Sequence, residues 1–128
     1  MTTYPLTQSG SLLYTNAALK GKNGVFHIRL LVDTGSTYTI MPWGHLAMSG
    51  LEPSLKVDSV QITAASGTII APRVRADWFS CCGLLLKSFP VIAHTLPSGL
   101  SSIGILGMDF LRAAKSQIDV FNSQLSTR

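Results

Sequence analysis

The sequence has few charged residues for its length. Only 12% of its 128 residues are Asp, Glu, Lys or Arg, whereas 46% are hydrophobic. This composition argues against intrinsic disorder and supplies enough apolar side chains for a single core. We therefore expect one globular domain spanning residues 1–128. So low a fraction of charged residues also favours a partner chain that covers part of the apolar surface.

Cysteines that could form an ordinary disulfide are also missing. The chain has only Cys81 and Cys82, and joining two adjacent cysteines would close a small strained ring, so we expect reduced thiols. The three histidines, His27, His45 and His94, are scattered and show no spacing typical of a zinc site. We therefore expect no metal and no cofactor.

Long apolar runs are absent as well. No window approaches the roughly 18 consecutive apolar residues that a membrane helix needs. The N-terminal sequence Met-Thr-Thr-Tyr-Pro has neither the basic start nor the apolar stretch of a signal peptide. The sequence thus predicts a soluble chain in a reducing compartment such as the cytoplasm, without membrane contact in this segment.

The net charge of +4 does not by itself indicate a nucleic-acid partner. Lys20 and Lys22, and Arg73 and Arg75, are close in sequence, but no basic stripe interleaved with aromatic residues accompanies them. The G-x-x-G at 104–107 has an apolar interior that suits burial. Nucleic-acid binding is therefore the third and weakest hypothesis, and it predicts steeply salt-dependent association.

The order of apolar runs and turn signals predicts an all-β domain with one or two short helices. Pro42 marks the start of one helix, and the turn-rich segments 21–24 and 96–99 separate strands. A break in the alternation near 58–59 suggests a bulge. We expect helices over 43–48 and 108–114, a hairpin tip over 64–68, and strands over 11–19, 25–32, 38–41, 55–63, 69–79, 84–86, 89–94 and 103–106.

Asp33 comes directly after the apolar run that ends at Val32. A carboxylate at the end of a buried strand is costly unless it is hydrogen-bonded or used chemically. Gly35 permits a tight turn there, and Thr34 and Ser36 supply hydroxyl groups. An ordinary Asx turn is the structural alternative for Asp33.

The segment L-V-D-T-G-S-T, followed downstream by I-L-G, resembles the signature of aspartic proteases. One copy in 128 residues resembles the retropepsins, in which a closed β-barrel places the active site at a homodimer two-fold axis. The resemblance implies a catalytic Asp33, supported by Thr34, Gly35 and Ser36. It further implies a substrate-binding flap at Ala64, Ala65, Ser66, Gly67, Thr68 and Ile69, and a structural brace at Ile105, Leu106 and Gly107.

The same resemblance suggests roles for the residues around Asp33. Thr34 would bond across the two-fold axis, the Gly35 N–H would donate to the carboxylate, and the Ser36 hydroxyl would favour its ionised form. Gly107 would avoid a collision with neighbouring backbone. We interpret Asp109 as structural, because a negative charge is favourable in the first turn of a helix.

Peptide hydrolysis without a metal or covalent intermediate needs a base for the water and an acid for the leaving nitrogen. One carboxylate cannot hold both states at once. Two Asp33 side chains meeting in a dimer would share a proton, as aspartic-protease pairs are known to do. The resemblance places the dimer sheet at the chain ends, for which we expect residues 117–126 and 3–13.

The leading hypothesis is therefore a homodimeric aspartic endopeptidase acting on a peptide or protein substrate. Apolar residues around the cleavage site are expected, because the predicted cleft walls are apolar, namely Ile40, Ile69, Ile70 and Ile103. The alternative is a dimeric peptide-binding or scaffolding module with the same fold and no useful turnover. The natural substrate, self-processing from a precursor and a viral, transposon-like or cellular source stay open.

Overall fold

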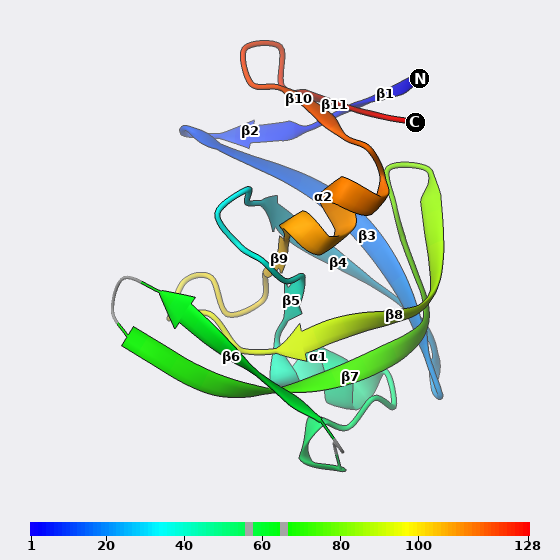
Figure 1. Ribbon diagram of the computed structural model, residues 1–128, viewed down its shortest axis with the longest axis vertical. Helices are drawn as coiled ribbons and strands as arrows, with labels where there is room; N and C mark the ends of the chain where they lie inside the picture. The colour runs from blue at the N-terminus through cyan, green and yellow to red at the C-terminus, as the bar shows by residue number, and fades with distance from the viewer. Residues whose placement is uncertain (56–57, 65–66) are drawn as a thin grey trace.

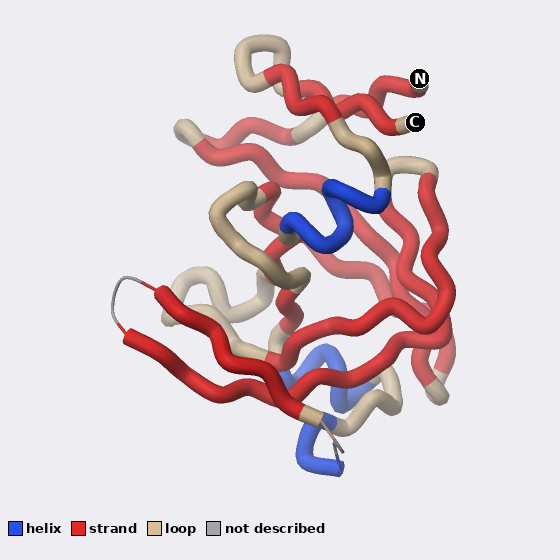
Figure 2. Tube along the Cα trace, in the orientation of Figure 1, coloured by secondary structure: helices blue, strands red, loops and turns tan. Residues whose placement is uncertain are grey.

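The computed structural model describes residues 1–55, 58–64 and 67–128, and strands dominate them (Figure 2). In this part of the chain the strands form one sheet of eight and one sheet of three. Two short α-helices accompany them. The predicted all-β class with short helices is confirmed.

Six strands of the larger sheet close into a barrel (Figure 1). Each strand pairs with the next, and a second pairing between the first and the last completes the ring. Because the ring is closed, each of these strands has a hydrogen-bonded neighbour on both sides over part of its length. In ring order they are β3 (Leu12–Gly21), β4 (Gly24–Val32), β9 (Gly104–Leu106), β5 (Ile40–Met41), β8 (Leu84–Ala93) and β7 (Gly67–Cys81).

The β3–β4 hairpin leads into the Asp33 loop. Its register runs from Tyr14 opposite Leu31 to Gly21 opposite Gly24, which matches the turn predicted over 21–24. Side chains alternate between the core and the surface along β4, from Val25 to Leu30, and along β3 from Ala17 to Gly21, as in a half-buried sheet. The apolar residues before Asp33 therefore anchor its strand in the barrel.

The segment predicted as two strands over 84–86 and 89–94 is one continuous strand, β8. It pairs with β7 from Leu84 to Ile92. The pairing register is the same on both sides of Ser88, which has a positive φ of 53°. The inward-facing phase of β7 also changes, from Val74 and Ala76 to Phe79. The change occurs where β7 begins to pair with β3, at Trp78, several residues after its pairing with β6 has ended at Pro72.

The strand predicted over 55–63 begins later than expected. Leu55 instead lies in the 3₁₀ helix η1 (Pro53–Leu55), and β6 spans Ser59–Ala64. Pro53 has the fixed φ of a helical first turn, and the Asp58 carboxylate accepts a hydrogen bond from the Ser59 N–H at 2.8 Å. The expected bulge near 58–59 adjoins residues 56–57, which lie outside the described part of the chain.

Helix α1 (Trp43–Met48) has its predicted bounds, and α2 (Met108–Ala113) ends one residue before the expected end. Helix α2 packs into the core through Phe110, whose ring meets those of Phe79 and Phe89 at centroid distances of 5.4 and 6.3 Å. Among the described residues, no helix has the length and apolar character to cross a membrane.

The smaller sheet holds both chain ends, which lie side by side opposite α1 in Figure 1. It consists of β1 (Thr2–Pro5), β11 (Gln124–Thr127) and β10 (Gln117–Asp119), with β11 in the middle. The terminal segments predicted for a dimer sheet thus pair with each other within the single chain. The short β2 (Thr7–Ser9) joins the edge of the large sheet beside β3.

The two cysteines lie at the β7–β8 turn, below the terminal sheet. Both are buried free thiols. The Cys81 thiol donates to the Cys82 Sγ at 3.8 Å, and this bond lowers the pKa of Cys82 to about 7 while the pKa of Cys81 rises. Thr127 of β11 donates to the Cys82 carbonyl at 3.5 Å, so the turn and the terminal sheet are connected.

Candidate active site

Asp33 stands at the end of β4, in the loop over residues 33–39. Its backbone N–H donates to the Leu106 carbonyl at 3.1 Å, which ties the loop to β9. The Gly35 N–H donates to Asp33 Oδ1 at 2.8 Å, the contact expected from the sequence. The carboxylate is half-buried, so it is both held in place and open to a ligand.

Two more backbone bonds attach the loop to the start of α2. The Met108 N–H donates to the Ser36 carbonyl at 2.8 Å, and the Asp109 N–H donates to the Thr37 carbonyl at 3.1 Å. The loop carbonyls therefore satisfy N–H groups that a helix start leaves without partners. The predicted brace thus extends beyond Ile105–Gly107 into the first turn of α2.

A buried side-chain network completes this attachment. Asp109 accepts hydrogen bonds from the Thr39 N–H at 3.0 Å and from the Thr39 hydroxyl at 2.7 Å. Thr39 Oγ1 in turn accepts from the Gly107 N–H at 3.2 Å. Asp109 also accepts from the Phe110 N–H at 2.7 Å, in keeping with a structural interpretation of this carboxylate.

Thr39 was not among the residues identified from the sequence. The sequence feature that could have identified it is a hydroxyl group inside the apolar segment 38–41. A hydroxyl buried there needs a hydrogen-bond partner. The side chain is fully buried. It joins the Asp33 loop to β9 and α2, so it is a positioning residue of the site.

At Gly107 the backbone of the brace lies directly against the backbone of the Asp33 loop. A Cβ built on it would lie 2.3 Å from the Tyr38 carbonyl oxygen and 2.9 Å from the Thr39 nitrogen. Both are backbone atoms, which cannot turn aside as a flexible side chain can. The expected collision is therefore present, and glycine is required by this approach.

The contact expected for Ser36 is wrong. Its hydroxyl donates to the Tyr38 carbonyl at 2.7 Å, inside the loop, and not to the Asp33 carboxylate. The carbonyl two residues ahead is the nearer acceptor in this turn, as in other short serine turns. Ser36 therefore shapes the loop through its hydroxyl.

Thr34 lies on a different side of the loop from the cleft. It is exposed and lines a separate hollow beside α2, together with Met108, Leu111 and Ile118. Ile118 belongs to β10 of the terminal sheet. Asp33 and Thr34 thus serve two neighbouring surfaces, one inside the cleft and one outside it.

Asp33 opens into a cleft with a volume of about 640 Å³. One wall is the Asp33 loop, and the facing wall is the β6–β7 hairpin, which Figure 1 shows reaching out from the barrel. Of the predicted flap residues, Gly67, Thr68 and Ile69 line the cleft. The backbone of Ala64 belongs to β6, and Ala65 and Ser66 lie outside the described residues.

Two of the four predicted wall residues, Ile40 and Ile69, line the cleft. Ile70 and Ile103 do not. Ile70 is 77% exposed because successive side chains of a strand point to opposite faces, so the face that presents Ile69 turns Ile70 away. The other apolar side chains of the cleft are Tyr38, Ile62, Leu96 and Ile105.

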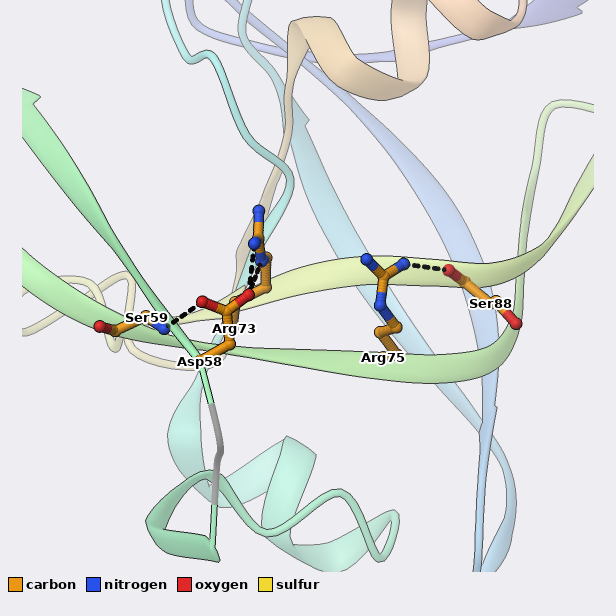
Figure 3. Close-up of polar contacts among 5 residues, drawn as sticks. All are labelled: Asp58, Ser59, Arg73, Arg75 and Ser88. Atoms are coloured by element: carbon orange, nitrogen blue, oxygen red, sulfur yellow. Dashed lines mark hydrogen bonds and ion pairs between the residues drawn. The ribbon is translucent and has the colours of Figure 1, made fainter.

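An ion pair spans the base of the β6–β7 hairpin (Figure 3). Arg73 Nε donates to the Asp58 carboxylate at 2.7 Å, and a second guanidinium nitrogen contacts the same oxygen. The Arg73 hydrogen bond holds the pKa of Asp58 below its ordinary value. Arg75, the other half of the basic pair, donates to the Ser88 carbonyl at 3.0 Å, so both arginines have partners within the sheet.

Comparison with known proteins identifies the family. The family model described as aspartyl protease matches residues 18–110, which include the Asp33 loop and the brace. The chain belongs to the aspartyl protease family. A retropepsin-like aspartic protease from Rickettsia conorii has a similar structure, with a TM-score of 0.72 and 19% sequence identity, covering 97% of this chain and 88% of that one. No curated protein sequence matched.

At that identity the structural likeness speaks for the fold alone, and it confirms the predicted retropepsin-like fold of this aspartyl protease. Among the described residues, no group of three His, Cys, Asp or Glu side chains is arranged to hold a metal ion. Asp33 is the single carboxylate among the described residues that line the cleft. Carboxylate chemistry in this cleft therefore depends on Asp33.

Proposed function

We propose that this aspartyl protease is a homodimeric endopeptidase in which Asp33 and Asp33 of the partner subunit hydrolyse a peptide bond. The observation that supports the proposal most is the placement of one braced carboxylate at the mouth of a cleft large enough for an extended peptide. A second carboxylate is needed for acid–base catalysis, and a two-fold axis beside the loop would supply it.

The chemistry follows from two carboxylates that share one proton. The ionised member accepts a proton from water as the water oxygen attacks the substrate carbonyl carbon. The protonated member donates a hydrogen bond to the carbonyl oxygen, and the leaving nitrogen departs as an amine after accepting a proton from the pair. The Gly35 N–H donates to Asp33 Oδ1 and so holds this carboxylate oxygen in a fixed position.

Contact between two protomers would involve the surface that carries Thr34. This exposed threonine lies next to the hollow formed by α2 and β10, outside the cleft. A two-fold axis there would bring the two Asp33 loops together while leaving each β6–β7 hairpin above the substrate. We propose that the hairpin acts as the flap and that Thr34 bonds between the loops.

The cleft walls favour apolar substrate side chains around the scissile bond. Five aliphatic side chains along the cleft come from five different segments, so an extended peptide would meet apolar surface on both walls. They are Ile40, Ile62, Ile69, Leu96 and Ile105.

The test is Asp33→Asn, which removes the acid–base group with little change in shape. We expect wild-type protein to cleave a mixed peptide library and the variant to lose at least about a thousandfold in rate, in line with the loss of a general base and acid together. Circular dichroism should show the same fold for both. Retained cleavage by the variant would refute the proposal.

Sedimentation measured on the same samples tests the dimer. A monomeric protein that cleaves at full rate would contradict the shared site, because one chain supplies one carboxylate to it. Peptide binding by wild type without any product would instead favour the scaffolding module.

A further inference from the structure

His94 follows β8 and is held firmly at the wall of the cleft. Its backbone N–H donates to the Met41 carbonyl at 3.0 Å. The next residue, Thr95, accepts a hydrogen bond from the Trp43 N–H at the start of α1, at 3.1 Å. Bonds to β5 and α1 therefore fix the backbone that carries this imidazole.

The strand pattern directs the side chain of His94 toward the cleft. Ala93 belongs to the main core, whereas Ile92 packs in the small apolar cluster with Ile40 and Ala71 below the cleft. Since side chains two residues apart in an extended segment share a face, His94 lies on the side of Ile92. It is half-buried and lines the same cleft as Asp33.

His94 is the one potential cation among the described residues that line the cleft. The other titratable groups there are Asp33 and Tyr38. On the neighbouring strand, Arg73 stands opposite Ile92, but its guanidinium is engaged by Asp58. Helix α1 carries His45, which is not among the described lining residues.

We propose that His94 makes the cleft select an acidic substrate side chain at one position away from the scissile bond, an inference that rests on the proposed protease function. The imidazolium donates a charge-assisted hydrogen bond to a Glu or Asp carboxylate, which is stronger in a partly desolvated cleft than in water. Histidine is the side chain that changes charge between pH 5 and 8. The selection therefore requires the charged imidazolium and is lost where the imidazole is neutral.

This pH dependence separates His94 from other sources of selectivity. Arginine stays charged throughout that range, so Arg73 would give a preference that does not change with pH. The shared proton of the Asp33 pair affects every substrate alike. A ratio of rates for two peptides that differ only as Glu and Gln cancels that common effect.

The experiment begins with library cleavage by the full chain at pH 5.5 and 7.5 to find the position at which acidic residues are enriched. Two peptides with Glu or Gln at that position are then compared by kcat/KM. We expect the Glu-to-Gln ratio to fall about tenfold from pH 5.5 to pH 7.5, as for loss of a hydrogen bond to a charged group. His94→Gln should make the ratio independent of pH, because its amide donates without titrating.

His27→Leu is the matched control, because His27 is exposed on β4 away from the cleft. It should keep the wild-type ratio at both pH values. A wild-type protein that cleaves peptides without acidic enrichment, or a ratio that still falls in His94→Gln, would overturn the role of His94 and leave the protease function standing. A wild-type protein that cleaves nothing would overturn the protease function and this inference with it.

Discussion

The two walls of the cleft are built in opposite ways. The Asp33 loop is bonded to β9 and α2 through backbone N–H groups and the buried Thr39–Asp109 pair. The β6–β7 hairpin faces it with the exposed start of β7, and among the described residues β6 pairs with β7 and with no other strand. A catalytic carboxylate needs a fixed position, whereas a cover over a substrate must open and close. The comparison thus separates a holding wall, tied to the barrel, from a hairpin wall with fewer attachments, which is the difference that the proposed catalytic and flap roles would need.

Hydrogen exchange should show the largest difference between the two walls. The amides of Asp33, Met108 and Asp109 donate to carbonyls of β9 and of the loop, so they should exchange only when the loop opens. Amides of the outer part of the hairpin, such as Ile62 and Thr68, should exchange at least about a hundredfold faster. Mass spectrometry or NMR can measure both sets in one sample. Equal protection of the two walls would remove the comparison.

Gly107→Ala should be the most damaging small substitution on the holding wall. The new Cβ would meet the Tyr38 carbonyl and displace the loop, which should cost about 3 kcal/mol or more in the free energy of unfolding. Urea denaturation measures it. Gly44→Ala in α1 is the control, because a Cβ there meets nothing within 4 Å and should stabilise the protein by about 0.5–1 kcal/mol. A Gly107 variant as stable as the control would show that the Asp33 loop can shift to make room for a methyl group at little cost in free energy.

Thr39→Val keeps the shape of the side chain and removes its hydroxyl. Gly107 N–H and one Asp109 oxygen would each lose a buried partner, so we expect a loss of about 2 kcal/mol in stability. The same change at Thr68 of the hairpin, an exposed side chain, should stay within about 0.5 kcal/mol. Thermal unfolding of both variants gives the comparison, and similar losses at the two sites would contradict it.

Asp58→Asn tests the base of the hairpin and should have the smallest effect. Because Arg73 lowers the pKa of Asp58 in the folded state, the pair stabilises the protein above the ordinary aspartate value of 3.8, and this stabilisation is lost as the pH falls through the lower folded value. The melting temperature of wild type should therefore slightly exceed that of the variant at neutral pH, and the two should converge in acid. A difference that grows in acid would contradict this sign.

An Arg73→Met variant and the double variant complete the cycle for this pair. Coupling between the two changes indicates an ion pair that holds the hairpin base together. Additive effects would mean that the two side chains act separately. In that case the hairpin depends on its strand pairing alone.

Local patterns were enough to predict the strand that leads to Asp33 and the turn that follows it, through the apolar run before it and the glycine two residues later. The brace at Ile105–Gly107 was predicted from the resemblance to retropepsins and not from a local pattern. The predicted contact was wrong for the Ser36 hydroxyl, which could donate to more than one acceptor. Ser36 has two nearby acceptors, and only the folded turn decides that its hydroxyl meets Tyr38. Ile70 and Ile103 were assigned to the cleft by composition, but strand phase and coiling decide which faces turn inward.

The sequence by itself determined the strand-rich class and the position of the aspartate after an apolar run, because each depends on residues adjacent in the chain. The need for glycine at 107 depends on the Tyr38 and Thr39 backbone, which lies far away in sequence. The tertiary structure alone decided that Thr39 and Asp109 meet across 70 positions, that the chain ends pair within one protomer and that His94 joins Asp33 in one cleft. Those contacts arise from barrel closure, which brings distant strands together in a register that no local pattern encodes.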